Sequence, residues 1–381
     1  MSVIVDGSNG LIFNDASTQT TAATGFGFKN RIINGAMVID QRNAGASVTP
    51  ASLAYTVDRW RAIMSATSAR FSVQQNAGSV TPPAGFTNYL GVTSLSAHSL
   101  ASGDQYGIQQ WIEGYNIADL AWGTASAKPV TLSFWVRSSL TGTFGGSLGN
   151  SGGGRSYPFT FTINSANTWE YETITIAGDT SGTWLADISR GIGVVFGLGV
   201  GSTLSGTAGS WSGSDFRSAT GATSVVSTNG ATFYITGVQL EVGSTATAFD
   251  YRDFGREFQM CQRYYQRCWD YGTATGTVVA GPVGGTWQYN QYSFFLGTGN
   301  YGINCATPFP TVMRATPTIT IYSAANGTAG SVTPWNGSDY SITSNSGFVN
   351  SSTTRITGAN YNNGTTAGLV YAFYWTAAAE L

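Results

Sequence analysis

The chain has 381 residues, enough for two or three domains that each bury a core. Only 9% of the residues are charged while 13% are aromatic, a balance that argues against a disordered chain. The formal net charge is −2 and the only lysines are Lys29 and Lys128, so no basic surface is expected for nucleic acid.

Neither a secretory signal nor a membrane span is expected. The first residues lack a basic region followed by a long apolar run. The longest apolar-looking run, residues 191–200, is nearly half glycine and falls short of the roughly twenty residues that a spanning helix needs. We therefore expect a chain made in a reducing cytoplasm that does not insert into a membrane.

Residues 1–27 hold two short apolar runs, Val3–Val5 and Leu11–Phe13, separated by a turn-rich segment. Two strands of this size cannot bury enough surface to be stable alone. They need partners, either identical copies of the chain or the rest of a larger particle. We predict that residues 1–27 form an attachment segment.

Residues 28–252 alternate between apolar and polar with a period of two, which is typical of half-buried strands. The residues expected to face inward in two of these strands are Val130, Leu132, Phe134, Val136, Tyr157, Phe159, Phe161 and Ile163. Short strands with frequent turn signals favour a β-sandwich over a parallel sheet with crossover helices.

Two glycine patterns stand out in this region. In residues 191–201 one face carries Ile192, Val194, Phe196, Leu198 and Val200, and the other is glycine except for Val195. Glycines along a strand face mark the close approach of a ligand, of a neighbouring chain or of a large aromatic from the same chain, the last of which we favour. In residues 231–242 the inward set changes phase, so Gly237 is a predicted β-bulge.

Helical spacing occurs in residues 255–268, where Phe258, Cys261, Tyr265 and Cys268 recur at intervals of three and four. Cys261 and Cys268 would then lie about 10 Å apart along the helix, too far for a disulfide, so free thiols are expected. We predict a connecting helix within residues 253–270. A second β-domain, residues 271–381, is predicted from strand patterns in 286–296, 316–322 and 368–375.

Several motifs, in the same order, resemble those of tailed-bacteriophage tail-fibre and other virion proteins whose central module looks like a jelly-roll carbohydrate-binding domain. They are Gly10–Ala22, Asn30–Arg42, Tyr55–Trp60, Gly237–Gly243, Phe249–Arg252, Cys261–Tyr265, Met313–Thr318 and Ala377–Leu381. The resemblance implies a virion component, commonly trimeric, that contacts cell-surface glycan. We interpret Asp58–Trp60 and Gln239–Glu241 as structural fixtures at strand ends rather than as a binding site.

Catalysis is not expected. The single histidine, His98, has no nucleophile motif near it, and no zinc-type cluster occurs. A glycosidase needs two carboxylates roughly 5–10 Å apart, which any of the 19 acidic residues can supply, so a polysaccharide depolymerase stays open. No cofactor is predicted, although a structural calcium ion held by loop carboxylates and carbonyls also stays open.

Sugar rings stack on aromatic side chains, so tryptophans and tyrosines on polar strand faces or in loops are the candidate glycan-binding residues. In the central module they are Trp111, Trp135, Trp169 and Tyr171. In the C-terminal domain they are Trp287, Tyr289, Tyr292, Trp335 and Tyr340. For each of them the alternative is that a helix, a loop or a neighbouring subunit covers the ring.

The fold class predicted from these patterns and from the resemblance is all-β: a jelly-roll β-sandwich, one short connecting helix and a C-terminal β-domain, assembled as a homotrimer. The function implied is a bacteriophage tail-fibre or receptor-binding subunit. It would be held to other virion proteins through residues 1–27 and would attach the particle to host surface glycan. The main alternative is a head decoration or baseplate protein without a ligand.

Overall fold

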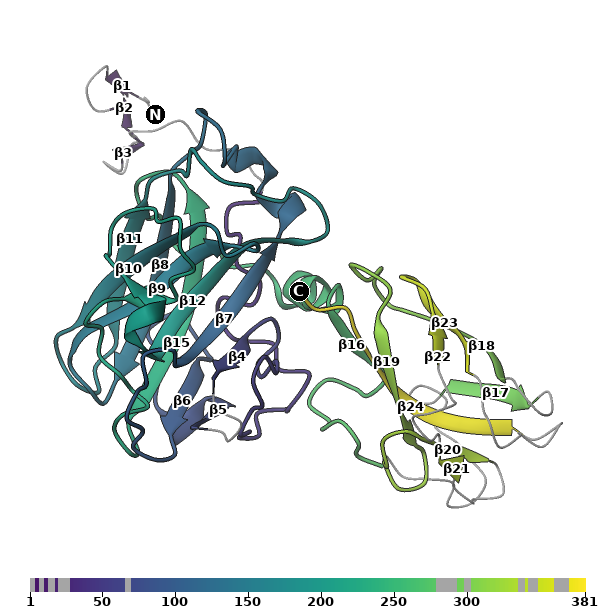
Figure 1. Cartoon of the computed structure of the whole chain (residues 1–381). Helices are drawn as coiled ribbons and strands as arrows, with labels where there is room; N and C mark the ends of the chain where they lie inside the picture. Colours follow the sequence, from purple (N-terminus) through teal and green to yellow (C-terminus); the bar gives the residue numbers. More distant parts are fainter. Residues whose placement is uncertain are drawn as a thin grey trace.

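The computed structural model describes residues 4–6, 10–12, 18–19, 28–65, 70–278, 293–297, 303–334, 340–341, 349–359 and 370–381. Figure 1 shows a β-sandwich beside a smaller β-sheet body, with one α-helix near the place where they join. The all-β class with a single short helix is therefore confirmed for the described residues. The division of the chain at residues 27, 252 and 270 stays a prediction.

The sandwich consists of two antiparallel five-stranded sheets. The first sheet has the order β11 (Glu170–Ile176), β8 (Val130–Ser138), β15 (Thr232–Val242), β6 (Leu90–Ser94), β5 (Phe71–Gln75). The second sheet has the order β10 (Ser156–Ile163), β9 (Gly142–Asn150), β12 (Arg190–Val200), β7 (Gln105–Glu113), β4 (Arg61–Met64). The chain crosses between the sheets repeatedly, and only β5–β6 and β9–β10 follow each other within one sheet, as in a jelly roll.

Smaller elements complete this part of the chain. The short parallel pair is β13 (Ser205–Gly206) with β14 (Ser218–Ala219). The 3₁₀ turns are η1 (Ala77–Ser79), η2 (Gly114–Asn116), η3 (Ala118–Leu120) and η4 (Ser202–Leu204). Near the N-terminus, β1 (Ile4–Asp6), β2 (Gly10–Ile12) and β3 (Thr18–Gln19) form an antiparallel sheet. The rest of the predicted attachment segment lies outside the described residues.

The core of the sandwich is built from the inward faces that the alternation predicted. All eight residues expected to face inward in β8 and β10 are at most 8% exposed. Phe134 from the first sheet contacts Phe196 and Phe161 from the second, with ring centroids 5.0 and 5.1 Å apart. These edge-to-face contacts bury large apolar area, which is the main stabilising term for a sandwich of this kind.

The glycine-rich face of β12 packs against side chains of the same chain, which is the alternative that we favour from the sequence. A Cβ added at Gly193 would lie 2.9 Å from the ring of Trp111, and one at Gly199 would lie 2.6 Å from Val226. The predicted bulge is also confirmed, because the register between β15 and β8 shifts between Thr236 and Gln239 around Gly237.

The helix is shorter than predicted. α1 spans Phe254–Gln262 and is capped by the side chain of Asp253, which accepts from the amide of Arg256 at 2.9 Å. The expectation that it continues to Cys268 is wrong, because β16 (Tyr265–Arg267) is a strand paired with β24 (Val370–Ala378). Cys261 and Cys268 are free thiols.

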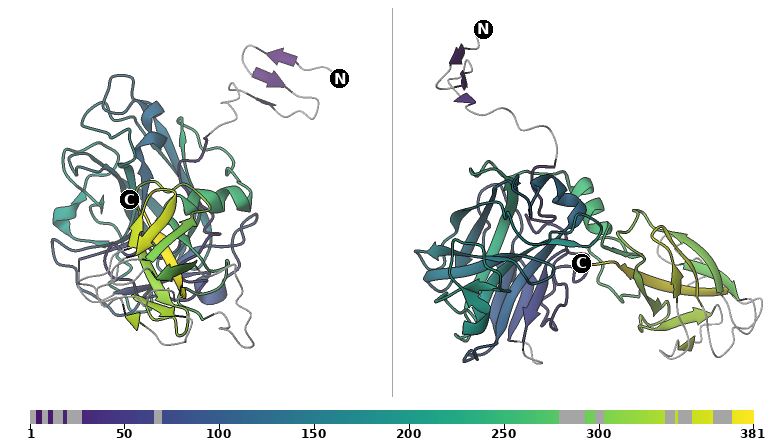
Figure 2. Two further views of the ribbon diagram at one scale, coloured as in Figure 1. Left: turned by 90° about the vertical axis from the view of Figure 1, so that its right-hand side faces the viewer. Right: turned by 45° about the horizontal axis from the view of Figure 1, so that its top comes forward.

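Among the described residues, the C-terminal part forms one nine-stranded sheet around the long strand β24. Its order is β21 (Tyr340–Ser341), β20 (Ser331–Pro334), β24, β17 (Ser293–Gly297), β18 (Ile303–Pro308), β23 (Arg355–Ala359), β22 (Val349–Ser351), with β16 and β19 (Thr318–Ser323) also paired to β24. Figure 2 shows this sheet extending away from the sandwich.

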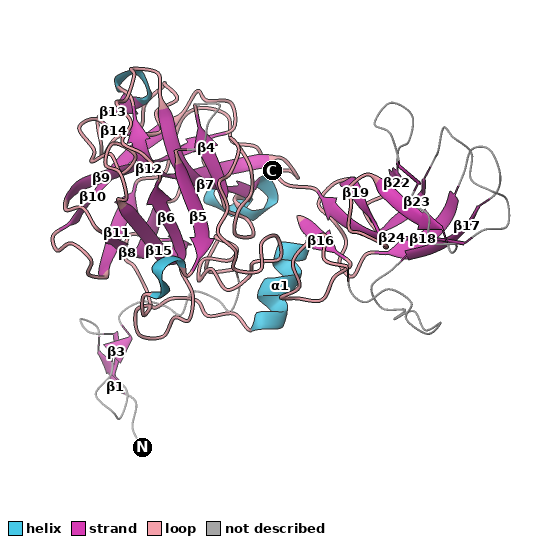
Figure 3. Cartoon of the chain, turned by 90° about the horizontal axis from the view of Figure 1, so that it is seen from below, coloured by secondary structure: helices cyan, strands magenta, loops and turns pink. Residues whose placement is uncertain are grey.

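The last residues of the chain return from β24 to the sandwich, and Figure 3 shows α1 and β16 at the same junction. Glu380 pairs with Arg42 at 2.8 Å and with the buried Arg59. Glu113 on β7 accepts from Arg263 at 2.6 Å and from the hydroxyl of Tyr264 at 2.7 Å. Buried ion pairs therefore fasten the two bodies together.

No helix of the described residues is long and apolar enough to cross a membrane.

Candidate binding groove

Two of the predicted aromatic residues meet on the outer face of the first sheet. Trp135 on β8 and Tyr171 on β11 are directly opposite in the strand register, and their ring centroids are 5.3 Å apart. Trp135 is half-buried and Tyr171 is 45% exposed. They lie in a groove of about 450 Å³ whose lining includes both rings.

The bulge on β15 forms the floor of this groove. Gly237 has φ +62°, and a Cβ there would lie 2.7 Å from the ring of Phe86 and 3.2 Å from Trp135. Only glycine combines this backbone conformation with such close ring contacts. The bulge therefore lets the aromatic side chains approach the backbone of the sheet.

A cluster of three rings lines the groove beside the tryptophan. Phe86 comes from the loop before β6, and Phe249 and Tyr251 follow β15. The centroids of Phe86–Phe249, Phe86–Tyr251 and Phe249–Tyr251 are 5.1, 5.5 and 4.9 Å apart. Tyr251 is 59% exposed, so the cluster offers an accessible aromatic surface. We call Phe86, Phe249 and Tyr251 the aromatic wall.

Buried polar residues of β15 hold the loop that carries this wall. Glu241 accepts from the amide and the hydroxyl of Thr247 at 2.8 and 2.6 Å, and Gln239 accepts from the amide of Asp250 at 2.8 Å. Gln239 and Glu241 are at most 4% exposed. Their interpretation as fixtures therefore agrees with their burial, and what they position is one side of the groove.

A second anchor joins the wall to the start of the sandwich. Asn30 donates to the carbonyl of Val238 at 3.1 Å and accepts from the amide of Leu240 at 3.1 Å. The buried Arg252 donates to the carbonyls of Asn30 and Ile32. Motifs that are far apart in the sequence thus converge behind the aromatic wall.

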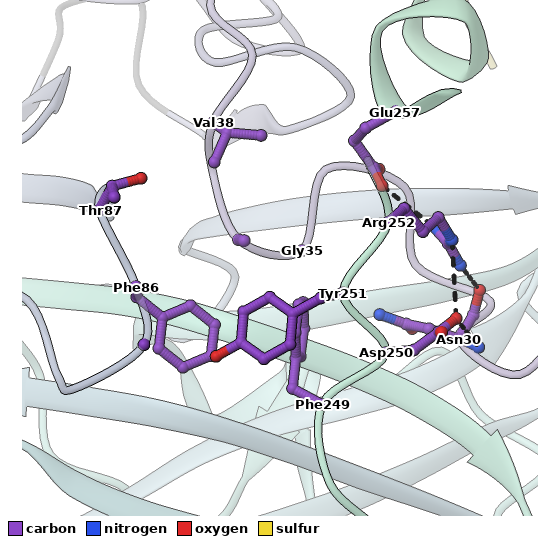
Figure 4. Close-up of a pocket in the computed structure, with 12 residues that line it drawn as sticks. Asn30, Gly35, Val38, Phe86, Thr87, Phe249, Asp250, Tyr251, Arg252 and Glu257 are labelled. Carbon is purple, nitrogen blue, oxygen red and sulfur yellow. Dashed lines mark hydrogen bonds and ion pairs between the residues drawn. The ribbon is translucent and has the colours of Figure 1, made fainter. Parts of the chain in front are cut away.

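A smaller pocket adjoins the groove and shares the aromatic wall with it. Its volume is about 110 Å³. It is lined by Asn30, Gly35, Ala36, Val38, Gly85, Phe86, Thr87, Phe249, Asp250, Tyr251, Arg252 and Glu257. Figure 4 shows the rings of Phe86 and Tyr251 side by side below Gly35 and Val38, with the charged residues and Asn30 gathered at one end and Thr87 at the other. We call this space the side pocket.

The described lining of the groove is aromatic, small and neutral. Besides the aromatics, the groove is lined by Ala84, Ser133, Gly237, Ala246, Thr247 and Ala248. None of the described residues that line it is an aspartate, glutamate, histidine, lysine or arginine. Stacking surface and neutral hydrogen-bonding groups are present, whereas a carboxylate for acid–base chemistry is not.

Two other predicted residues do not join this groove. Trp111 lies on the outer face of the second sheet as expected, but it is 4% exposed because Ile33, Tyr264 and Leu381 pack around it. Its assignment as a glycan-binding residue is corrected: a covered ring cannot stack on a sugar. Trp169 borders the first sheet and is half-buried, donating from Nε1 to the carbonyl of Thr81 at 2.9 Å. It supports the loop that carries Phe86.

The C-terminal candidates stay predictions. Trp287, Tyr289, Tyr292 and Trp335 lie outside the described residues. Tyr340 begins the short strand β21, whose backbone alone is described.

Sequence reasoning missed the aromatic wall. Phe249 and Tyr251 stand in the Phe249–Arg252 motif, whose only signal in the sequence is its resemblance to virion proteins, and Phe86 carries no strand pattern. The sequence feature that could have indicated it is the predicted bulge at Gly237, because a glycine there lets another side chain approach the backbone of the sheet.

His98 makes structural contacts. Its Nε2 lies 2.8 Å from Asp104 Oδ2 and 3.2 Å from the Tyr106 hydroxyl, and no serine or cysteine side chain of the described residues hydrogen-bonds to the ring. Within the described part of the chain, no three His, Cys, Asp or Glu side chains gather closely enough to hold a metal ion.

No protein-family model and no curated protein matches the chain. Among solved structures, it is similar to the tailspike protein 4 enzymatically active domain of bacteriophage CBA120 (13% identity, TM-score 0.31, covering 56% of this chain and 21% of that one). It is also similar to the family 11 carbohydrate-binding module of Clostridium thermocellum in complex with a β-1,3-1,4-mixed-linked tetrasaccharide (12%, 0.28, 53% and 98%). A third is TmCBM61 in complex with β-1,4-galactotriose (11%, 0.26, 48% and 88%). The chain thus spans about a fifth of the tailspike domain, and TM-scores this low assign neither a ligand nor an activity to it.

Proposed function

We propose that this chain is a non-catalytic glycan-binding protein whose ligand lies in the groove on the first sheet. The observation that carries the proposal is the cross-strand pair of Trp135 and Tyr171, set beside the aromatic wall in a groove whose described lining residues are all uncharged. Aromatic faces stack on the apolar faces of pyranose rings, while hydroxyls such as that of Tyr251 exchange hydrogen bonds with sugar hydroxyls.

We further propose that the protein is a bacteriophage tail-fibre or receptor-binding subunit, made in the host cytoplasm and carried on the virion. The order of its motifs supports this setting, as does the small N-terminal sheet, which is too short to be stable without partners. In a homotrimer, three weak sites that reach one surface together gain avidity far beyond that of a single site.

A glycan array probed with the full chain tests the binding proposal. Trp135→Ala and Tyr171→Ala should each weaken binding of the best glycan by at least tenfold, which corresponds to about 1.4 kcal/mol. Tyr115→Ala is the matched control, because Tyr115 is 61% exposed and does not line the groove. Unchanged binding by both groove variants would overturn the proposal.

The rival functions predict other outcomes. A purely structural virion protein would bind no glycan on the array and no host cell. A depolymerase would release new reducing ends from host polysaccharide, and this activity would have to come from carboxylates outside the groove, since none of the described lining residues is acidic.

A further inference from the structure

The side pocket is much smaller than the groove beside it, with a volume of about 110 Å³. An acetamido or O-acetyl group is a small substituent suited to such a space, whereas a pyranose with its hydroxyls is considerably larger than either group. The neighbouring groove of about 450 Å³ has room for sugar rings.

The position of the side pocket suits a substituent on a sugar in the groove. The two spaces share Phe86, Phe249 and Tyr251, whose ring centroids are at most 5.5 Å apart. The side pocket therefore lies next to a sugar ring bound against the aromatic wall.

The lining of the side pocket is apolar on one side and polar on the other. Gly35 and Val38 lie opposite the aromatic wall on the apolar side, where a methyl group fits, and Ala36 also lines the pocket. On the polar side, Asp250 uses Oδ2 for the amide of Asn30 and for Arg252. Its Oδ1 is an acceptor for an amide N–H or a sugar hydroxyl.

The charges beside the pocket disfavour an anionic group. Arg252 is the only cation among the described lining residues, and its side chain is 5% exposed. It donates to the carbonyls of Asn30 and Ile32 and pairs with Glu257 at 3.3 Å and Asp250 at 3.6 Å. With two carboxylates to one guanidinium, a sulfate, phosphate or carboxylate would meet net negative charge.

We infer that the side pocket takes a small neutral acyl group, so the glycan that this protein binds carries acetyl substituents. The inference rests on the proposed function, because the sugar ring that bears the acetyl group has to lie in the groove. Both N-acetyl and O-acetyl groups have the required size and neutrality.

Matched ligand pairs test the inference. The array carries oligomers of N-acetylglucosamine beside glucose, N-acetylgalactosamine beside galactose, and an O-acetylated bacterial polysaccharide beside its alkali-treated form. The full chain should bind at least one acetylated member at least tenfold more tightly than its partner. Whether the N-acetyl or the O-acetyl pairs show the preference identifies the source of the acyl group.

Variants separate the pocket from the groove. Ala36→Leu and Val38→Phe fill the side pocket and should remove the preference within a pair while retaining binding of the unacetylated member. Val38→Ala enlarges the pocket and should keep the preference, which controls for damage to the fold. Trp135→Ala should weaken binding of both members.

The outcomes are distinguishable. Equal binding of both members of every pair, still reduced by Trp135→Ala, would overturn the acyl inference and leave the proposed function standing. A preference that survives both filling variants would also overturn the inference. Binding of no glycan at all would overturn the proposed function and the inference together.

Discussion

Gly237 shows how one residue shapes the groove. It combines φ +62° with ring contacts that a Cβ would violate, at 2.7 Å from Phe86. Gly237→Ala should therefore lower the free energy of unfolding by more than the backbone strain alone, which is about 1 kcal/mol, and should also weaken glycan binding.

Gly221→Ala is the matched control for this substitution. Gly221 has φ +79° with nothing within 4 Å of an added Cβ. Gly221→Ala should therefore lose only the stability that the left-handed backbone conformation costs an alanine. Denaturant unfolding measures both changes. Equal losses of stability for the two variants would show that the ring contacts at Gly237 carry no cost.

Asp58 makes the stability of the fold depend on pH. Its side chain is 1% exposed, and burial raises the pKa of this carboxyl from its ordinary 3.8 to about 6, against the opposing effects of Arg42 and Gln41. Because the folded state holds the proton more tightly, the contribution is fully present below pH 3.8 and is lost as the pH rises through about 6.

Asp58→Asn removes this titration. The stability of the wild type relative to the variant should fall by roughly 2–3 kcal/mol between pH 4 and pH 7, as a pKa difference of about two units implies. Unfolding free energies measured across this range check the slope. A difference that stays constant or grows with pH would contradict the raised pKa.

At the scale of elements, the strands of the sandwich were predictable and the end of the helix was not. Alternation in residues 129–138 and 157–163 reports the local environment of each side chain, and the apolar residues at every second position face the core. Tyr265–Arg267 is a strand because of pairing with Thr376–Ala378, more than one hundred residues away. Periodicity within a window of fourteen residues carries no information on such a partner.

The junction between the sandwich and the C-terminal sheet depends on Glu380. Its carboxylate pairs with Arg42 and Arg59, and the Arg59 side chain is 1% exposed. Glu380→Ala would leave a buried guanidinium unpaired and should cost about 3–5 kcal/mol. Thermal unfolding measures the loss.

Asp215→Ala provides the comparison for the junction. The ion pair of Asp215 with Arg217 is partly exposed, and breaking it should cost at most about 1 kcal/mol. If both variants lost the same stability, Glu380 would contribute no more than a surface charge.

For the whole molecule, composition and strand patterning predicted the all-β class, whereas the groove depended on loops. Trp135 and Tyr171 could be found because strand alternation places them on a polar face. Phe249 could not, since its loop is held by hydrogen bonds from Thr247 and Asp250 to Glu241 and Gln239. Phe86 could not either, since its loop is held by the hydrogen bond from Trp169 to Thr81. The burial of Trp111 likewise depends on the return of Leu381 to the sandwich.

The proposed homotrimer can be tested by measuring the mass of the protein in solution. Light scattering should give a mass near three times the 40.0 kDa of one chain. A monomer at micromolar concentration would remove the argument that the small N-terminal sheet is stabilised by copies of itself.

The position of the bound glycan tests the central claim most directly. ¹⁹F NMR of protein labelled with 5-fluorotryptophan resolves individual tryptophans, and the Trp135 signal is assigned by its loss in Trp135→Phe. On addition of the best glycan from the array, the Trp135 signal should shift while those of Trp184 and Trp211, which pack together with centroids 5.6 Å apart and do not line the groove, stay in place. A shift at Trp184 or Trp211 with Trp135 unmoved would contradict the groove on the first sheet as the binding site.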